Sequence, residues 1–95
     1  MLLQITQMEH LGQGIYSLLF NDGKKGTIDS TLLADDEPST VFSHFKNKDF
    51  VCKARLNNGT LEWPNEIDIA PEYLYFLAFK NSPELHETFS SWGYI

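Results

Sequence analysis

Apolar and polar residues alternate in the first third of the chain with the two-residue period of β-strands. This pattern predicts strands over residues 3–9, 15–20 and 25–29, because successive side chains of a strand point to opposite faces. Asp22 and Gly23 separate the last two runs, and an Asp-Gly pair between apolar runs is typical of a tight hairpin turn. We therefore expect three antiparallel strands at the start of the fold.

The middle of the chain predicts a short helix. Ser39 and Thr40 are typical helix N-cap residues, and the helix ends at residues 47–49. An acidic loop over residues 35–38 leads into it. The apolar residues that would form its buried stripe are Val41, Phe42 and Phe45.

Two further strands follow the helix. Residues 50–56 alternate again, and residues 60–63 return after a hairpin turn centred on Asn58 and Gly59. Pro64 ends the pairing because it has no amide donor. The alternation places Phe50, Cys52, Ala54 and Leu56 inside, with Lys53 and Arg55 facing water.

Proline and glycine residues frame the helices at the end of the chain. Pro71 suits the first turn of a helix, and Glu72 beside it favours the positive end of the helix dipole. Pro83 begins a last helix, which Gly93 ends.

The order of these elements predicts an α+β fold. We expect a two-layer domain with an antiparallel sheet, in which a core of three strands, a helix and two strands precedes one or two C-terminal helices. A chain of 95 residues is the size of a single domain, so we expect one domain over residues 1–95. The hydrophobic content of 42% is enough to fill one core.

Acidic residues outnumber basic ones, and their distribution is uneven. The net charge of −6 disfavours direct binding to the phosphates of nucleic acid. From residue 60 onward Lys80 is the only basic residue, and the acidic ones are Glu62, Glu66, Asp68, Glu72, Glu84 and Glu87. This acidic third would attract a basic protein. The alternative is a solvated face that only aids solubility.

We expect a cytoplasmic protein without a membrane contact. The first eight residues lack the features of a signal peptide, and no stretch approaches the roughly 20 apolar residues of a membrane span. Cys52 is the lone cysteine and cannot form an internal disulfide, which suits a reducing compartment.

Several motifs resemble those of a known family. They are Phe20-x-Asp22-Gly23, Gly26-x-Ile28-Asp29, Gly59-Thr60-Leu61-x-Trp63-Pro64-Asn65 and Asp68-Ile69-Ala70-Pro71-Glu72-x-Leu74-Tyr75. Over residues 3–75 the chain resembles the small bacterial domain-of-unknown-function family numbered twenty-four forty-two, with residues 76–95 as a C-terminal helical extension. The resemblance implies a β-rich α+β fold and brings no established catalytic residues. Some relatives carry a DNA-binding helix-turn-helix domain after this module, for which the 20 residues after Tyr75 are too few. Others are encoded beside a toxin-like partner.

A candidate ligand site consists of Trp63, Asp68, Glu72 and Tyr75. Two carboxylates four residues apart can hold a cation or perform acid–base chemistry. In the structural alternative, which we favour, Asp68 accepts backbone hydrogen bonds and Glu72 faces the helix dipole. Trp63 then fills the core, with its indole N–H bonded nearby.

The other reactive side chains form no recognisable constellation. His10, His44 and His86 are scattered and have no cysteine pair beside them, so we expect no metal site and no cofactor. Asp29 is expected to cap a turn over residues 31–33.

The end of the chain has more large apolar side chains than a small monomer can bury. Residues 73–79 are apolar all round, which is unusual for a surface helix, and the end of the chain adds further rings. The candidate partner interface is Tyr73, Phe76, Leu77, Phe79, Phe89, Trp92 and Tyr94. Either a partner covers these side chains, or the last helix folds back and the two helices cover each other.

From these observations we expect a non-enzymatic protein-interaction module, antitoxin-like or regulatory, that binds a basic protein. The alternatives are a structural homodimer through the same surface, and a small-ligand-binding domain around Trp63, Asp68 and Glu72.

Overall fold

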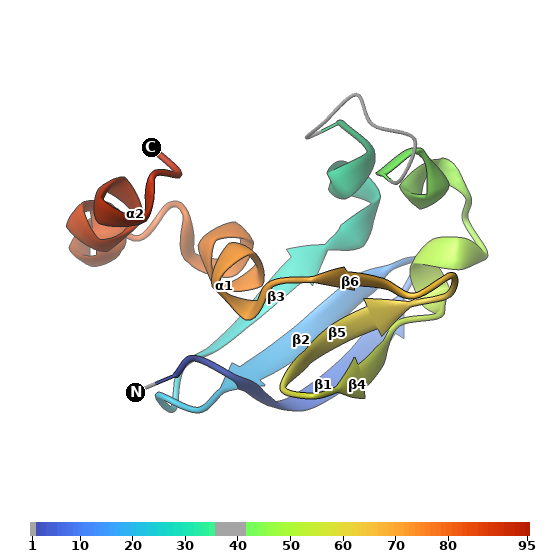
Figure 1. Cartoon of the computed structure of the whole chain (residues 1–95), viewed down its shortest axis with the longest axis horizontal. Helices are drawn as coiled ribbons and strands as arrows, with labels where there is room; N and C mark the ends of the chain where they lie inside the picture. The colour runs from blue at the N-terminus through green and yellow to red at the C-terminus, as the bar shows by residue number, and fades with distance from the viewer. Residues whose placement is uncertain (1, 36–41) are drawn as a thin grey trace.

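The computed structural model describes residues 2–35 and 42–95, and six strands in these residues form two antiparallel sheets (Figure 1). The strands are β1 (Ile5–Gly12), β2 (Ile15–Phe20), β3 (Lys25–Asp29), β4 (Arg55–Asn57), β5 (Thr60–Trp63) and β6 (Ile67–Ile69). The helices are α1 (Pro71–Phe79) and α2 (His86–Trp92), with short 3-10 helices η1 (Ser30–Asp35), η2 (Phe42–Lys46), η3 (Phe50–Cys52) and η4 (Pro83–Leu85). The α+β class is confirmed, but the strands form two sheets instead of the one predicted.

The first sheet has the order β1-β2-β3 and follows the predicted hairpins closely. β2 and β3 have the predicted bounds, whereas β1 begins two residues later than expected and extends to Gly12. The alternation on β2 places Tyr16, Leu18 and Phe20 in the core, each 1% exposed or less. Hairpin chemistry therefore sets the register of this sheet.

The second sheet has the order β4-β5-β6 and corrects the prediction for residues 50–56. Phe50–Cys52 form a 3-10 helix, and β4 begins only at Arg55. A 3-10 helix turns about 120° per residue, so the expected alternation fails there. Val51 is buried, whereas Leu56, which the alternation placed inside, is 40% exposed.

Trp63 lies in the core. Its ring packs edge-on against Phe45, with ring centroids 5.0 Å apart, and against Tyr16 at 6.1 Å. Its indole Nε1 donates to the carbonyl oxygen of Val51 at 3.4 Å, and the Tyr16 hydroxyl donates to the same oxygen at 2.7 Å. The prediction that Trp63 fills the core is confirmed. One buried carbonyl oxygen accepts a hydrogen bond from each of these two large aromatic side chains.

The predicted helix of the middle segment is described only in part. Its cap at Ser39 and Thr40, and Val41, lie outside the described residues, as does most of the acidic loop. The described part, η2, is a 3-10 helix, and Phe45 on it is buried as expected.

Two aspartates hold the turns that flank β3. Asp22 Oδ1 accepts the backbone N–H of Lys24 at 2.9 Å, and Asp29 Oδ1 accepts that of Thr31 at 3.0 Å. Both are Asx-type contacts, in which the side chain replaces a backbone acceptor. The structural predictions for these two carboxylates are confirmed.

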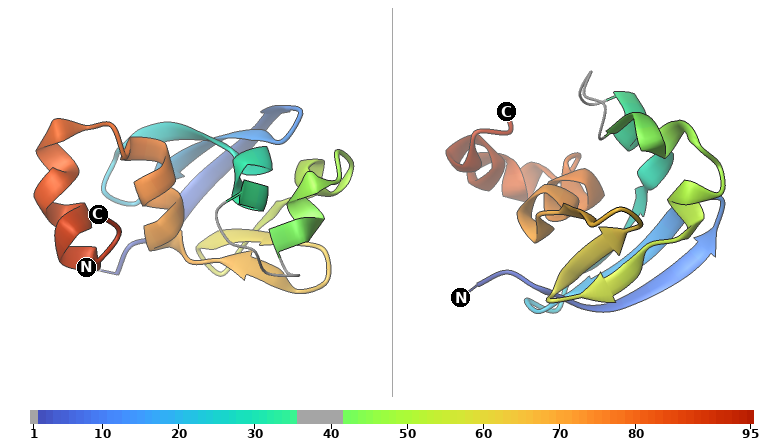
Figure 2. Two further views of the ribbon diagram at one scale, coloured as in Figure 1. Left: turned by 90° about the horizontal axis from the view of Figure 1, so that it is seen from above. Right: turned by 45° about the vertical axis from the view of Figure 1, so that its right-hand side comes forward.

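The C-terminal helices stack outward from the sheets. α1 packs on β3 above Gly26, where an added Cβ would lie 2.9 Å from the Phe79 ring. Figure 2 shows α2 beyond α1, away from both sheets. Because α1 touches the sheet on one side and α2 on the other, it is apolar all round.

Candidate functional site

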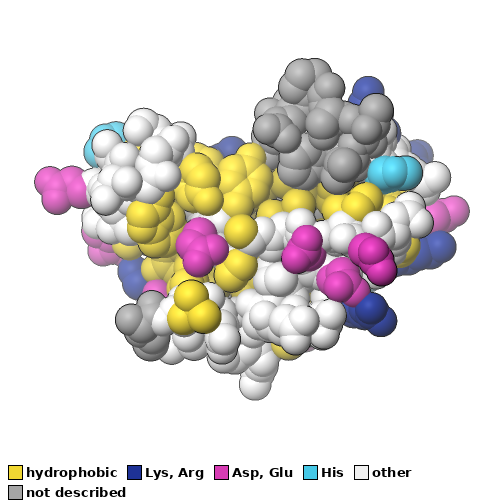
Figure 3. Space-filling model, in the orientation of Figure 1, with side chains coloured by type: hydrophobic (Ala, Val, Ile, Leu, Met, Phe, Trp, Pro, Cys, Tyr) yellow, Lys and Arg dark blue, Asp and Glu magenta, His cyan; other side chains and the backbone are white. Residues whose placement is uncertain are grey.

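Four aromatic side chains gather on the outer side of the two C-terminal helices. Tyr94 lies 5.4 Å from Tyr73, 5.1 Å from Phe76 and 6.2 Å from Trp92, measured between ring centroids. Trp92 is 40% exposed and the other three are half-buried. We call these four residues the aromatic patch. Figure 3 shows hydrophobic side chains gathered over this part of the molecule, with acidic side chains beside them.

A helix C-cap places Tyr94 in the aromatic patch. Gly93 adopts φ 87°, and its N–H donates to the carbonyl of Ser90, while the N–H of Tyr94 donates to that of Phe89. This pair of bonds is a Schellman motif, which reverses the chain direction at a left-handed residue. The reversal turns Tyr94 back onto α1 instead of into solvent.

Phe89 anchors this arrangement from below. It is fully buried, with ring centroids 5.1 Å from Phe76 and 6.2 Å from Tyr75. The last helix therefore does fold back on α1, as the second of our two explanations required. Phe89 offers no surface to a partner, and including it in the candidate interface was wrong.

The remaining predicted interface residues divide between two locations. Phe79 packs against Phe20 and above Gly26, on the sheet side of α1. Leu77 faces a hollow beside β3. Only Tyr73, Phe76, Trp92 and Tyr94 share the outer surface, so the aromatic patch is smaller than the predicted interface.

The Glu72 carboxylate borders the aromatic patch. Burial, and then the nearby charge of Glu72, raise the pKa of the Tyr94 hydroxyl, because both disfavour tyrosinate. Glu84 and Glu87 are exposed on the last two helical segments, and Glu84 lies 3.9 Å from Lys24. Of these three carboxylates, Glu72 is the one whose charge acts on a ring of the aromatic patch, and Lys24 offsets part of the charge of Glu84.

The four residues of the candidate ligand site do not come together. Trp63 and Tyr75 are 1% and 4% exposed, whereas Asp68 points to solvent on β6, opposite Glu62. The backbone hydrogen bonds expected at Asp68 do not occur within the described part of the chain. Glu72 lies in the first turn of α1, as the dipole argument required.

Tyr75 ties α1 to the first hairpin. Its hydroxyl donates to Asp22 Oδ2 at 2.7 Å, across 53 positions of sequence, and its ring lies 4.9 Å from that of Phe20. Burial, and then the hydrogen bond to Asp22, raise the pKa of this hydroxyl well above its usual range. Asp22 thus closes its own turn with one oxygen and anchors the helix with the other.

This contact predicts a loss of stability at alkaline pH. The folded pKa of Tyr75 lies above the unfolded value, so the folded state keeps a proton that the unfolded state releases, and the free energy of unfolding falls as pH rises above about 10. Tyr75→Phe should lower stability at pH 7 by about 1 kcal/mol through the lost hydrogen bond. It should also flatten the alkaline slope, as urea unfolding at several pH values between neutral and strongly alkaline would measure. A slope unchanged from the native protein would contradict this role of Tyr75.

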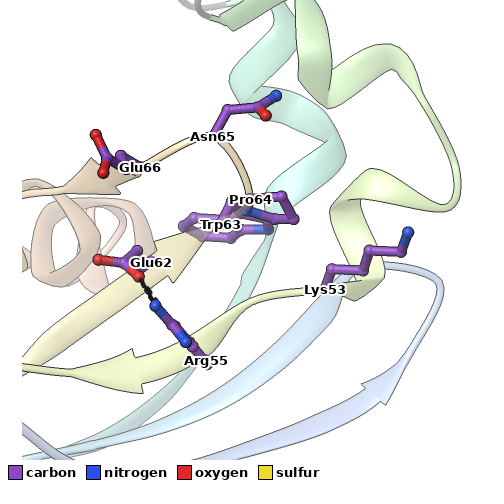
Figure 4. A pocket seen from close by; sticks show the side chains of 7 residues that line it. All are labelled: Lys53, Arg55, Glu62, Trp63, Pro64, Asn65 and Glu66. Carbon is purple, nitrogen blue, oxygen red and sulfur yellow. Dashed lines mark hydrogen bonds and ion pairs between the residues drawn. The ribbon is translucent and has the colours of Figure 1, made fainter.

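A shallow hollow of about 410 Å³ lies beside the end of β5 (Figure 4). Its charged residues are Lys53, Arg55, Glu62 and Glu66. Arg55 Nε donates to Glu62 at 2.9 Å, and this hydrogen bond is the main cause of the lowered pKa of the Glu62 carboxyl. The two acids balance the two bases, so the hollow attracts neither sign of charge strongly.

The turn beside this hollow is conformationally unusual. Asn65 and Glu66 have φ of 70° and 60°, both in the left-handed region. Asparagine accepts this conformation readily, and glutamate does so with strain. In Figure 4 the side chains of Lys53, Asn65 and Glu66 diverge. The geometry is that of a tight connection between β5 and β6, not of converging ligands.

A hollow of about 480 Å³ contains Cys52. The thiol is half-buried in the 3-10 helix η3, not on a strand as predicted, and Lys48, Asp29 and Thr31 also line this space. Within residues 2–35 and 42–95, no three His, Cys, Asp or Glu side chains lie close enough together to hold a metal ion. The aromatic patch is the arrangement best suited to recognition.

Comparison with protein families gave one finding. The family model described as "Protein of unknown function (DUF2442)" matches residues 5–80, which run from β1 to just past the end of α1. Neither curated proteins nor solved structures gave a match. None of the helices in the described ranges has the length and apolar character to cross a bilayer.

Proposed function

This chain belongs to the DUF2442 family, and we propose that it is a non-enzymatic module that binds a basic protein through the aromatic patch. The observation that carries this proposal is a cluster of four aromatic rings, one exposed and three half-buried, with the Glu72 carboxylate beside it. Aromatic side chains supply much of the binding energy in protein interfaces, because they bury a large area with few rotatable bonds.

The charge around the aromatic patch supports a basic partner. Lys80 is the only base among residues 60–95, against six acids, and Glu72 stands directly beside Tyr94. Such a surface repels nucleic acid and speeds the approach of a cationic protein. An antitoxin-like or regulatory role suits a module of this kind, since it would act by occupying a basic surface on its partner.

The aromatic patch also favours a partner with an apolar strip. Trp92 is the most exposed ring, and Ile95, 54% exposed, lies three residues beyond it. A helix with lysines along one side and leucines along the other presents both features that this surface would recognise. Such a helix is therefore the appropriate probe.

The test is a calorimetric titration with a synthetic amphipathic helix of leucine and lysine, compared with one of leucine and glutamate. We expect saturable binding of the lysine helix alone, weaker at 1 M salt because charges there are screened within about 3 Å. Trp92→Ala should weaken binding about tenfold or more, as expected for the most exposed ring of the aromatic patch.

Two control variants distinguish binding at the aromatic patch from non-specific apolar or electrostatic binding elsewhere on the surface. Leu56→Ala removes an apolar side chain that is also 40% exposed but lies on β4, and it should leave binding unchanged. Glu72→Gln should weaken binding, whereas Glu9→Gln, at an exposed position on β1, should not. Equal binding of both helices, or equal effects of the paired variants, would refute the proposal.

A further inference from the structure

The outer edge of β3 has no partner in the described structure. On its inner edge, Phe20 donates to the carbonyl of Lys24, and Ser30 donates to that of Gly14, which fixes the alternation of the β2–β3 ladder. The backbone groups of Lys25, Thr27 and Asp29 therefore point outward. Within residues 2–35 and 42–95 no other strand pairs with these outward groups.

The other strand edges are protected against pairing with a strand of a second chain. β1 has two register shifts, and its start is covered where Ile5 donates to the carbonyl of Gly59 at 2.7 Å. β4 and β6 are only three residues long. Bulges and short strands are common protections against unwanted pairing. β3, with five residues in uninterrupted register with β2, has neither.

The sequence of this edge is complementary to itself. If two copies of β3 pair antiparallel around Thr27, Lys25 of each copy stands opposite Asp29 of the other. Their side chains share one face, because Gly26 and Ile28 point to the opposite face, toward α1 and the core. Opposite charges and paired threonines are both favourable across antiparallel strands.

Asp29 is able to form this contact. Both of its hydrogen bonds to Thr31 use Oδ1, and the described residues give Oδ2 no bond. Lys25 is exposed and is in no ion pair within the described part of the chain. Each Lys25–Asp29 pair across the two strands would therefore join a lysine and a carboxylate oxygen that have no other ionic partner within the described residues.

An apolar margin lies on the other face of the same edge. A hollow of about 330 Å³ beside β3 is lined by Leu32, which is 53% exposed, and by Leu77. In the antiparallel register around Thr27, the strand of a second copy would run past this hollow with its Lys25 end, while its own Leu32 and Leu77 would lie at the opposite end of the joined strands. Burial of these leucines adds a hydrophobic contribution to the backbone pairing.

We infer that the chain forms a symmetric homodimer in which the β3 strands of two copies pair antiparallel around Thr27 and join the two first sheets. Each outward residue, Lys25, Thr27 and Asp29, then donates and accepts a backbone hydrogen bond. This contact uses a surface different from the aromatic patch and does not depend on the proposed function.

The first test removes one edge donor. Thr27→Pro deletes an outward N–H and leaves the bonds to β2 intact, since prolines are tolerated on edge strands. Sedimentation equilibrium should show its dimer dissociation constant raised about tenfold or more, and Thr27→Ala, which keeps the N–H, should change it less than about threefold. A native protein that stays monomeric at high micromolar concentration, or equal effects of both substitutions, would overturn the inference.

The second test exchanges charges. Lys25→Glu places acid opposite acid in a homodimer, and Asp29→Lys places base opposite base, so each variant alone should be monomeric. An equimolar mixture pairs every acid with a base and should form a heterodimer. Circular dichroism checks that each variant is folded. A mixture that remains monomeric, or single variants that still dimerise, would contradict the register.

Discussion

Trp63→Ala should lower the free energy of unfolding by about 3–5 kcal/mol, the usual loss when a buried tryptophan is reduced to alanine. The ring is 1% exposed and packs edge-on against Tyr16 and Phe45, so truncation leaves a cavity between the two sheets. The Val51 carbonyl also loses one of its donors. Urea denaturation followed by circular dichroism measures the difference.

Trp92→Ala is the matched control, because it removes the same side chain from the surface. Trp92 is 40% exposed, and its loss should cost about 1–2 kcal/mol. Trp63 belongs to the core, whereas Trp92 belongs to the proposed recognition surface. Equal losses, or a larger loss at Trp92, would contradict this assignment.

Gly14→Ala should destabilise the fold by about 2–5 kcal/mol through two separate effects. Gly14 has φ 82°, and a left-handed conformation costs a residue with a Cβ about 1–2 kcal/mol. An added Cβ would also lie 2.8 Å from Val51 Cγ2 and 2.9 Å from Ser30 Oγ. Overpacking of a tight site costs about 1–3 kcal/mol more.

Gly23→Ala separates the two effects. Gly23 has φ 89°, but nothing lies within 4 Å of its added Cβ. This variant should therefore show only the backbone strain, about 1–2 kcal/mol. Thermal unfolding of the two variants side by side gives the comparison. If Gly14→Ala were no worse than Gly23→Ala, close packing around Gly14 would be disproved.

Local chemistry made the hairpins and helix ends predictable. Gly23, Asn58 and Gly59 adopt positive φ with little strain, and Gly93 ends α2 in the left-handed conformation as expected. Pro71 marks the start of α1 for the same local reason. At these positions the residue type itself limits the backbone, so no distant contact can change the outcome.

The error at residues 50–56 arose because tertiary packing overrode a weak local pattern. Alternation predicted one strand, but burying Phe50 and Val51 together requires a 3-10 helix at the edge of the core. β6 was missed because Ile67–Ile69 is too short to show a period. A sequence of three residues cannot separate a strand from a loop.

The candidate site was predicted only in outline. The excess of aromatic side chains after residue 73 identified the region, but which rings stay accessible depends on how α2 crosses α1. Phe89 is buried and Trp92 is not, although both lie on the same short helix. The contact between Tyr75 and Asp22 spans 53 positions, and no local sequence pattern predicts it. The sequence could not predict which individual residues of distant segments contact each other.

The emission of Trp92 during the lysine-helix titration is the most direct test of the aromatic patch as the recognition surface. Trp63→Phe protein, in which Trp92 is the sole tryptophan, should show a saturable blue shift, while Trp92→Phe protein should show none because Trp63 is buried. An unchanged Trp92 spectrum with a bound helix would contradict the account, because the partner would then occupy another surface.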